Sequence, residues 1–104
     1  MTEAVFTHWD DLQQVGITTS VDGCRYQLRY QDGQSFYTSD DYPLPRLTGK
    51  HEQPAGHQLK MPEVGDSVLI ELASSGQIIH WGYMRHYLDL VERRYGTSFL
   101  TAVS

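Results

Sequence analysis

Two Asp-Gly dipeptides, at 22–23 and 32–33, constrain the fold of this chain more than any other feature of its sequence. Asp-Gly favours the positive φ angles of a type I′ turn, whose twist matches that of the two strands it joins. Between the dipeptides, apolar and polar residues alternate over 24–30. A period of two is typical of a strand with one buried and one wet face. Each dipeptide is therefore expected to turn the chain between neighbouring antiparallel strands.

The two faces of this predicted strand carry different chemistry. The inward positions are Cys24, Tyr26, Leu28 and Tyr30, and the outward positions are Arg25, Gln27 and Arg29. Because Cys24 points inward, we expect a buried, inert thiol rather than a nucleophile. Residues 17–21 and 35–38 flank the strand and complete a three-stranded antiparallel meander.

Apolar residues near the N-terminus repeat with helical spacing. Val5, Phe6, Trp9 and Leu12 are separated by gaps of one, three and three, and a glycine follows as a stop signal. This pattern predicts a short amphipathic helix over about 3–14.

Residues 39–62 break both patterns. They hold all four prolines of the chain, together with two of its nine glycines. Proline removes a backbone donor and glycine loosens the chain, so a long irregular loop is expected here, with room for one short strand near 58–61. Loops of this length in a compact domain are usually functional or disordered.

Within this loop, the stretch DDYPLPR at 40–46 is a candidate contact segment. Its two prolines favour an extended backbone that presents Tyr42, Leu44 and Arg46 outward. Such a segment can dock into the groove of a partner. The alternative is a stiff connector whose Tyr42 and Leu44 fold back onto the core.

A second hairpin is predicted after the loop. Residues 68–72 are apolar and β-branched enough for a strand, 74–76 supply a Ser-Ser-Gly turn, and 77–83 return. The stretches VGDSVLIEL and IIHWGYM resemble the hairpins of SH3-like small barrels. The resemblance covers about a fifth of the chain and implies a small, partly closed barrel.

The last regular element is predicted to be an amphipathic helix. Its apolar stripe consists of Met84, Tyr87, Leu88, Val91 and Tyr95. Two arginines fall in its last turn, and a glycine follows as a C-cap. The chain is therefore expected to form a single α+β domain over 1–104, with an N-terminal and a C-terminal helix. Its antiparallel sheet has about five strands, a three-stranded meander plus a hairpin, or closes in part into an SH3-like barrel.

Charge is distributed unevenly along the chain. Residues 1–45 carry seven acids and two bases, whereas 46–104 carry six of each. Since nucleic-acid-binding proteins usually show a clustered basic surface, we expect no direct nucleic-acid binding. No apolar run approaches the ~18 residues that span a bilayer, and the first residues do not read as a secretory signal. The single cysteine suits a reducing compartment, so we expect a cytoplasmic protein without membrane contact.

Catalytic and metal sites are only faintly indicated. Glu71 and His80 would face each other across the second hairpin as a carboxylate–imidazole pair, yet no nucleophile elbow or phosphate loop accompanies them. The pairs His51/His57 and His80/His86 lack the spacing of a zinc motif. We therefore expect no catalytic residue, no metal and no cofactor, and more readily a binding protein than an enzyme.

The stretch HWGYMRHY at 80–87 joins the last predicted strand to the last helix. By parity its rings at 81 and 83 share one side of the strand and are expected to pack, while Gly82 admits a close neighbour. Arg85 and His86 fall at the positive end of the helix dipole, where cations are disfavoured, and such local conflicts often mark functional sites. The residues expected to meet a ligand or partner are His80, Trp81, Tyr83, Arg85, His86, Tyr42, Arg46 and Glu71.

Three functions are compatible with these features. The leading hypothesis is a small non-enzymatic interaction protein that self-associates or docks a protein partner through an aromatic-rich surface around the second hairpin and the 39–62 loop. The first alternative is a small-molecule-binding domain or minor enzyme with a pocket between the sheet and the C-terminal helix. The second alternative is an acidic inhibitor or immunity-type protein that binds a basic target.

Overall fold

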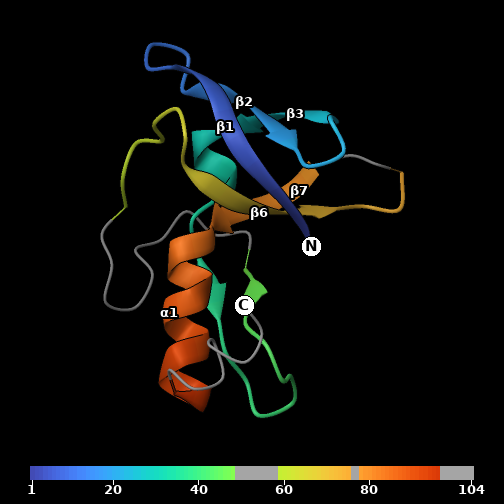
Figure 1. The fold of residues 1–104 in the computed structure, drawn as a ribbon, viewed down its shortest axis with the longest axis vertical. Helices are drawn as coiled ribbons and strands as arrows, with labels where there is room; N and C mark the ends of the chain where they lie inside the picture. The colour runs from blue at the N-terminus through green and yellow to red at the C-terminus, as the bar shows by residue number, and fades with distance from the viewer. Residues whose placement is uncertain (49–58, 76–77, 97–104) are drawn as a thin grey trace.

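The computed structural model describes residues 1–48, 59–75 and 78–96. Its main feature is a five-stranded antiparallel sheet that curls into a half-barrel, with one helix at its base (Figure 1). The strands are β1 (Thr2–Asp10), β2 (Val15–Ser20), β3 (Arg25–Arg29), β6 (Ser67–Leu72) and β7 (Ile78–Tyr83). Their order in space is β3-β2-β1-β6-β7, so β1 lies at the centre. The expected α+β class with an antiparallel sheet is confirmed.

The two ends of this sheet approach each other. An isolated parallel bridge joins Gly33, shortly after β3, to Trp81 in β7. The indole Nε1 of Trp81 donates a hydrogen bond to the carbonyl oxygen of Arg29 at 2.7 Å. Three consecutive strands are followed by a fourth that returns beside the first, which is the order of a Greek key. The sheet therefore forms a partly closed barrel.

The helix expected over 3–14 is wrong, because these residues form β1 and the turn after it. Ala4 and Phe6 point into the barrel while their neighbours face outward, which is the period of a strand. The register shifts just after Phe6, so Trp9 also packs inward, with 5.8 Å between the two ring centroids. Leu12, the last residue of the expected stripe, is 96% exposed in the turn.

The first Asp-Gly turn is confirmed. It joins β2 to β3, which pair antiparallel, and Gly23 has a φ of +89°. Leu28 is fully buried and the three outward positions of β3 are exposed, as the alternation predicts. Cys24 is exposed rather than buried, because β3 begins only at the next residue and Cys24 belongs to the turn.

The second Asp-Gly dipeptide does not form a hairpin turn, so the meander consists of β1, β2 and β3. Residues Tyr30–Asp32 form a short 3-10 helix, η1, and the chain then leaves the main sheet. β4 (Phe36–Tyr37) pairs with β5 (Arg46–Leu47) in a separate two-stranded sheet. Gly33 serves close packing instead of a turn, since a Cβ on it would lie 2.2 Å from the indole of Trp81.

Two clusters of buried side chains form the core. The larger fills the barrel and consists of Ala4, Phe6, Leu28, Val68, Ile70, Trp81 and Tyr83. The smaller consists of Phe36, Leu47 and Leu69, with Met84, Tyr87 and Leu90 packed against it. Gly82 admits the close neighbour expected of it, since a Cβ there would lie 2.5 Å from the ring of Phe36.

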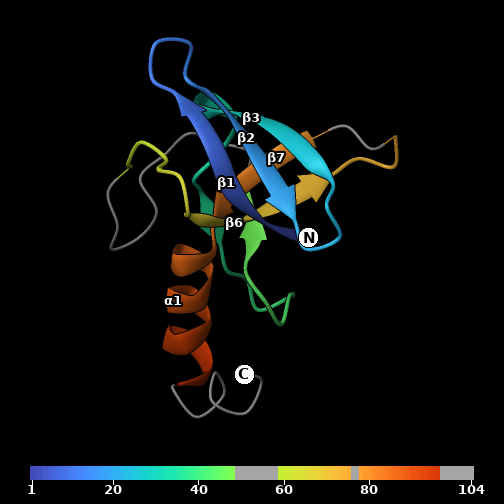
Figure 2. The same cartoon turned by 45° about the horizontal axis from the view of Figure 1, so that its top comes forward.

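The second hairpin and the last helix are confirmed. β6 and β7 pair antiparallel, and α1 (Met84–Tyr95) begins directly after β7. Gly96 ends the helix at a φ of +83°, and its N–H donates to the carbonyl oxygen of Glu92 at 2.7 Å. Figure 2 shows α1 extending away from the barrel, beside the segment that carries β4 and β5. No helix among the described residues is both long and apolar enough to cross a membrane.

The expected irregular loop at 39–62 holds one short strand in its first half, β5, and not at its end. The described residues 59–61 form no strand. Residues 49–58, with the pair His51/His57, lie outside the described residues, as does the turn glycine at position 76.

Candidate functional site

Three of the expected site residues, Tyr42, Arg46 and Glu71, line one open hollow of about 500 Å³. The segment that leads into β5 forms one wall, β6 contributes Glu71, and α1 contributes Tyr87. The other lining residues are Met1, Pro43, Leu44 and Pro45. The structure thus brings the proline segment together with the end of β6 and the side of α1. We call this region the 42–46 hollow.

Arg46 stacks on Tyr42 in the wall of the 42–46 hollow. Its guanidinium carbon lies 3.8 Å from the centroid of the Tyr42 ring, which is a cation–π geometry. Its backbone is held by pairing with Tyr37 in the two-stranded sheet. The side chain is exposed, and no carboxylate of the described residues forms an ion pair with it. The guanidinium therefore remains available to an anion.

The last turn of α1 fixes the backbone of this segment. Nη1 of Arg94 donates hydrogen bonds to the carbonyl oxygens of Ser39 at 2.9 Å and Tyr42 at 2.7 Å. The hydroxyl group of Tyr95 donates to the carbonyl oxygen of Pro43. These bonds satisfy three carbonyl groups that no strand partner reaches, so a stretch with little regular structure is held in one conformation.

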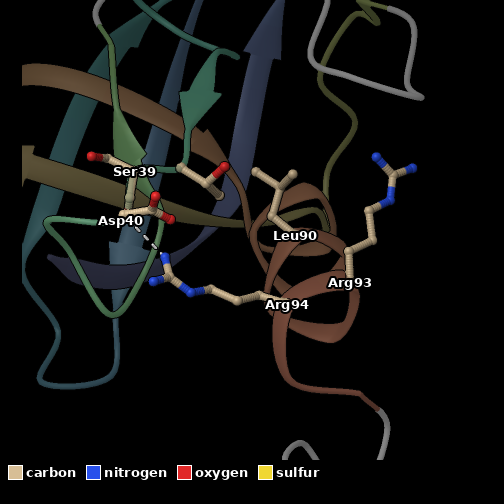
Figure 3. Close-up of a pocket in the computed structure, with 6 residues that line it drawn as sticks. Ser39, Asp40, Leu90, Arg93 and Arg94 are labelled. Atoms are coloured by element: carbon tan, nitrogen blue, oxygen red, sulfur yellow. Dashed lines mark hydrogen bonds between the residues drawn. The ribbon is translucent and has the colours of Figure 1, made fainter.

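A second hollow, of about 610 Å³, lies beside this helix turn (Figure 3). It is lined by Thr38, Ser39, Asp40, Leu90, Arg93 and Arg94. Figure 3 shows Arg94 reaching toward Ser39 while Arg93 points away from it. Arg93 lies 3.0 Å from the carboxylate of Asp89, one turn earlier on the same helix. Both cations are therefore engaged within the chain, and the 42–46 hollow offers the freer charge.

Glu71 and His80 are directly opposite each other on β6 and β7, as predicted. Both side chains are half-buried, and Glu71 lines the 42–46 hollow. No ion pair or hydrogen bond joins the two side chains in the part of the chain that the structure describes. They are cross-strand neighbours rather than an assembled carboxylate–imidazole pair.

The stretch 80–87 does not converge on one site. Trp81 and Tyr83 are buried inside the barrel, at 0% and 3% exposure, and pack as expected. His86 is also buried, and the centroid of its ring lies 5.4 Å from that of Tyr83. Arg85 is exposed on the first turn of α1. Of the expected site residues in this stretch, Trp81, Tyr83 and His86 therefore fill the core, and Arg85 is exposed.

Tyr83 is held as a neutral donor inside the barrel. Burial raises the pKa of its phenol well above the usual range, and the nearby carboxylate of Asp66 adds to the rise. Its hydroxyl group donates to the carbonyl oxygen of Lys60 at 3.1 Å. The ammonium group of Lys60 lies 5.1 Å from the centre of the Tyr83 ring and 3.0 Å from Asp66. Tyr83 thus ties the barrel to the segment that precedes β6.

Sequence reasoning missed one buried polar residue at the same junction. Gln34 is fully buried and has a left-handed φ of +88°. Its N–H donates to the carbonyl oxygen of Trp81 at 2.8 Å, and its Oε1 accepts from the N–H of Lys60 at 3.0 Å. It therefore joins the residues after β3 both to β7 and to the segment before β6. Nothing in the sequence distinguishes this glutamine from the exposed ones.

The described residues contain no group of three His, Cys, Asp or Glu side chains placed to hold a metal ion. Comparisons of the chain with protein-family models, with curated proteins and with solved structures find no match. The 42–46 hollow is the place where expected site residues meet in the described part of the chain.

Proposed function

We propose that this protein is a non-enzymatic interaction protein that self-associates through the 42–46 hollow. One observation carries the proposal: the guanidinium of Arg46, stacked on Tyr42, has no acidic partner among the described residues. At the other end of the same short segment, Asp40 and Asp41 are exposed and have no ion pair among those residues. A segment that carries unpaired acids at one end and an unpaired base at the other is complementary to a second copy of itself.

A two-fold symmetric dimer would place the acidic end of each segment beside the basic end of the other. In an isologous dimer each patch contacts its own copy, so a contact from residue i to residue j occurs twice. Two segments that run antiparallel place Arg46 of each protomer beside the partner's Asp41. Tyr42 and the 40% exposed side chain of Leu44 lie between these charges and supply apolar area to bury.

The clamp from α1 favours binding by this segment. Because Arg94 and Tyr95 already hold the backbone of 39–43, little conformational freedom is lost when a partner docks. A contact surface that is ordered beforehand keeps more of its contact energy as affinity. The proposal thus rests on charges that are placed and unpaired, on exposed apolar side chains between them, and on a backbone fixed in advance.

Charge reversal tests the proposed dimer. Arg46→Asp places like charges together at two symmetry-related points, so the dissociation constant should rise at least about tenfold. Asp41→Arg should have the same effect, and the double variant Arg46→Asp/Asp41→Arg should restore dimerisation. Sedimentation velocity over a concentration series measures all three.

Arg85→Asp is the matched control, since Arg85 is an exposed arginine on the first turn of α1 and does not line the hollow. It makes the same change in net charge and should leave the dissociation constant unchanged. A wild-type chain that stays monomeric up to high concentration would contradict the proposal. So would a folded double variant that fails to recover association.

A further inference from the structure

The outer edge of β3 carries backbone groups that the sheet does not use. β3 ends the strand order on one side, so β2 is the one strand among the described residues that pairs with it. The N–H of Tyr30 donates to Gln14 at 2.9 Å, and the carbonyl oxygen of Cys24 accepts from Ser20 at 2.8 Å. In an antiparallel ladder the residues that bond to a given neighbour alternate. The backbone groups of Arg25, Gln27 and Arg29 therefore point away from β2.

One end of this edge is already closed. The carbonyl oxygen of Arg29 accepts the hydrogen bond from the indole of Trp81, and Gly33 forms its bridge to Trp81 just beyond. The hydrogen bond to Arg29 confirms that the backbone groups of Arg25, Gln27 and Arg29 point away from β2. No strand among the described residues covers Arg25 and Gln27 in the same way. Two N–H donors and two carbonyl acceptors therefore remain at an exposed strand edge.

The side chains of this edge are basic, although the chain as a whole has a net charge of −5. Arg25 and Arg29 are both exposed on the outer face of the sheet. Arg29 is paired with Asp32, with 2.8 Å between Nε and Oδ2. Arg25 has no ion pair within the described ranges. The edge thus presents two cations: Arg25, which has no ion pair among the described residues, and Arg29, which is paired with Asp32.

We propose that an extended acidic segment of a partner protein adds to the sheet as a sixth strand along Arg25–Gln27. Main-chain hydrogen bonds supply affinity in this mode of recognition, and alternate side chains supply specificity. An acid opposite Arg25 meets it directly, and an acid opposite Gln27 lies diagonally to both arginines, within reach across a sheet. The intervening residues of the incoming strand share the face of Tyr26 and Leu28 and are best apolar.

Charge complementarity selects this occupant over a second copy of β3. If two β3 edges paired, four arginines would gather on one face of a short ladder, and like charges across strands are destabilising. The surface is also separate from the 42–46 hollow, which is built from β5, β6 and α1. Self-association and strand addition therefore occupy different faces of the molecule.

The test uses a synthetic peptide in which valine and glutamate alternate, V-E-V-E-V, with both ends capped. The sequence reads the same in both directions, so either strand orientation places acids beside the arginines. Titration followed by amide chemical shifts should show saturable binding. The shifts should be largest at Arg25 and Gln27, whose amides should also exchange more slowly. Added salt should weaken the binding, because the charged contacts are exposed.

Two variants locate the site. Gln27→Pro removes an N–H that points away from β2, so the ladder to β2 is retained while one edge donor is lost. Binding should fall roughly tenfold, as expected for a lost hydrogen bond with its neighbours disturbed. Gln27→Thr keeps the N–H and should bind like the wild type. Arg25→Glu, a change at an exposed side chain, should also weaken binding roughly tenfold.

Three results would overturn the proposal. The proposal fails if the peptide does not bind, or if a lysine version, V-K-V-K-V, binds as well as the glutamate version. It also fails if Arg25→Glu leaves binding unchanged, and this variant decides the matter should Gln27→Pro not fold. Arg46→Asp should retain peptide binding, which separates this surface from the proposed dimer.

Discussion

At the scale of single residues, Gly33 decides how the two ends of the sheet meet. A Cβ at this position would lie 2.2 Å from the indole of Trp81, which is closer than any side-chain atom can approach. The same close approach allows the backbone bridge between Gly33 and Trp81 and the hydrogen bond from the indole to Arg29. The absence of a side chain at one residue thus allows the barrel to close in part.

We predict that Gly33→Ala destabilises the protein by about 1–3 kcal/mol, because the added methyl group overpacks a fully buried ring. Chemical denaturation of the wild type and the variant measures the free energy of unfolding. Gly23→Asn is the control, since Gly23 has open space around it and asparagine tolerates its positive φ. A Gly33→Ala variant as stable as Gly23→Asn would show that the packing does not constrain this contact.

Some residues of the candidate site were predictable from sequence and others were not. Tyr42 and Arg46 were found because two prolines predict an extended backbone that presents alternate side chains. The burial of His86 and Gln34 was missed because it depends on tertiary packing and not on local pattern. A buried glutamine with a left-handed backbone has no local sequence signature, since asparagine and glycine are the usual residues there.

At the scale of elements, β1 shows how an irregular strand can imitate a helix. A strand keeps strict alternation only while its register holds, and here the register shifts just after Phe6. Phe6 and Trp9 then both turn inward although they are three positions apart, which is the spacing of a helical stripe. The hairpin of β6 and β7 and the helix α1 were predicted with nearly their true bounds, because the register shift in the hairpin lies at its far end, between Glu71 and Leu72.

The last turn of α1 acts on a different element through Arg94. We predict that Arg94→Ala lowers the free energy of unfolding by about 1 kcal/mol, since two hydrogen bonds to carbonyl groups are lost at an exposed position. The freed segment should dock less well, so the proposed dimer should weaken about threefold or more. Amide exchange over 39–42 should accelerate, which locates the effect.

Arg93→Ala serves as the control for this element. Arg93 pairs with Asp89 within α1, and such an exposed pair contributes only about 0.3–0.5 kcal/mol. Its removal should leave amide exchange over 39–42 unchanged. If both variants behaved alike, helix stability alone would account for the effect, and the clamp on the proline segment would have to be abandoned.

At the scale of the whole molecule, stability should fall in alkaline solution. Burial raises the pKa of Tyr83 in the folded state, so above the pKa of an unfolded tyrosine, about 10, the unfolded chain loses this proton first. The folded state then binds more protons than the unfolded state, and the free energy of unfolding decreases as pH rises further. Below pH 10 the contribution of Tyr83 is fully present.

Denaturation at several pH values between 8 and 11 measures this slope, which Tyr83→Phe should reduce. The variant also loses the hydrogen bond to Lys60, about 1 kcal/mol, at every pH, so the slope and not the absolute stability is the informative quantity. Tyr37→Phe changes an exposed tyrosine and should leave the slope as it is. An unchanged slope in Tyr83→Phe would assign the alkaline loss to other groups.

The central position of β1 sets the order in which the barrel can assemble. Its pairing with β2 is local, but Ala4 also pairs with Val68, in a strand that comes much later in the chain. As the chain grows from its N-terminus, the meander can form early, while one side of β1 stays unpaired until β6 arrives. An unpaired edge of a central strand can pair with another chain, and pairing between strands far apart in sequence is slow. Productive folding of this protein therefore depends on how quickly its last third returns to the first strand.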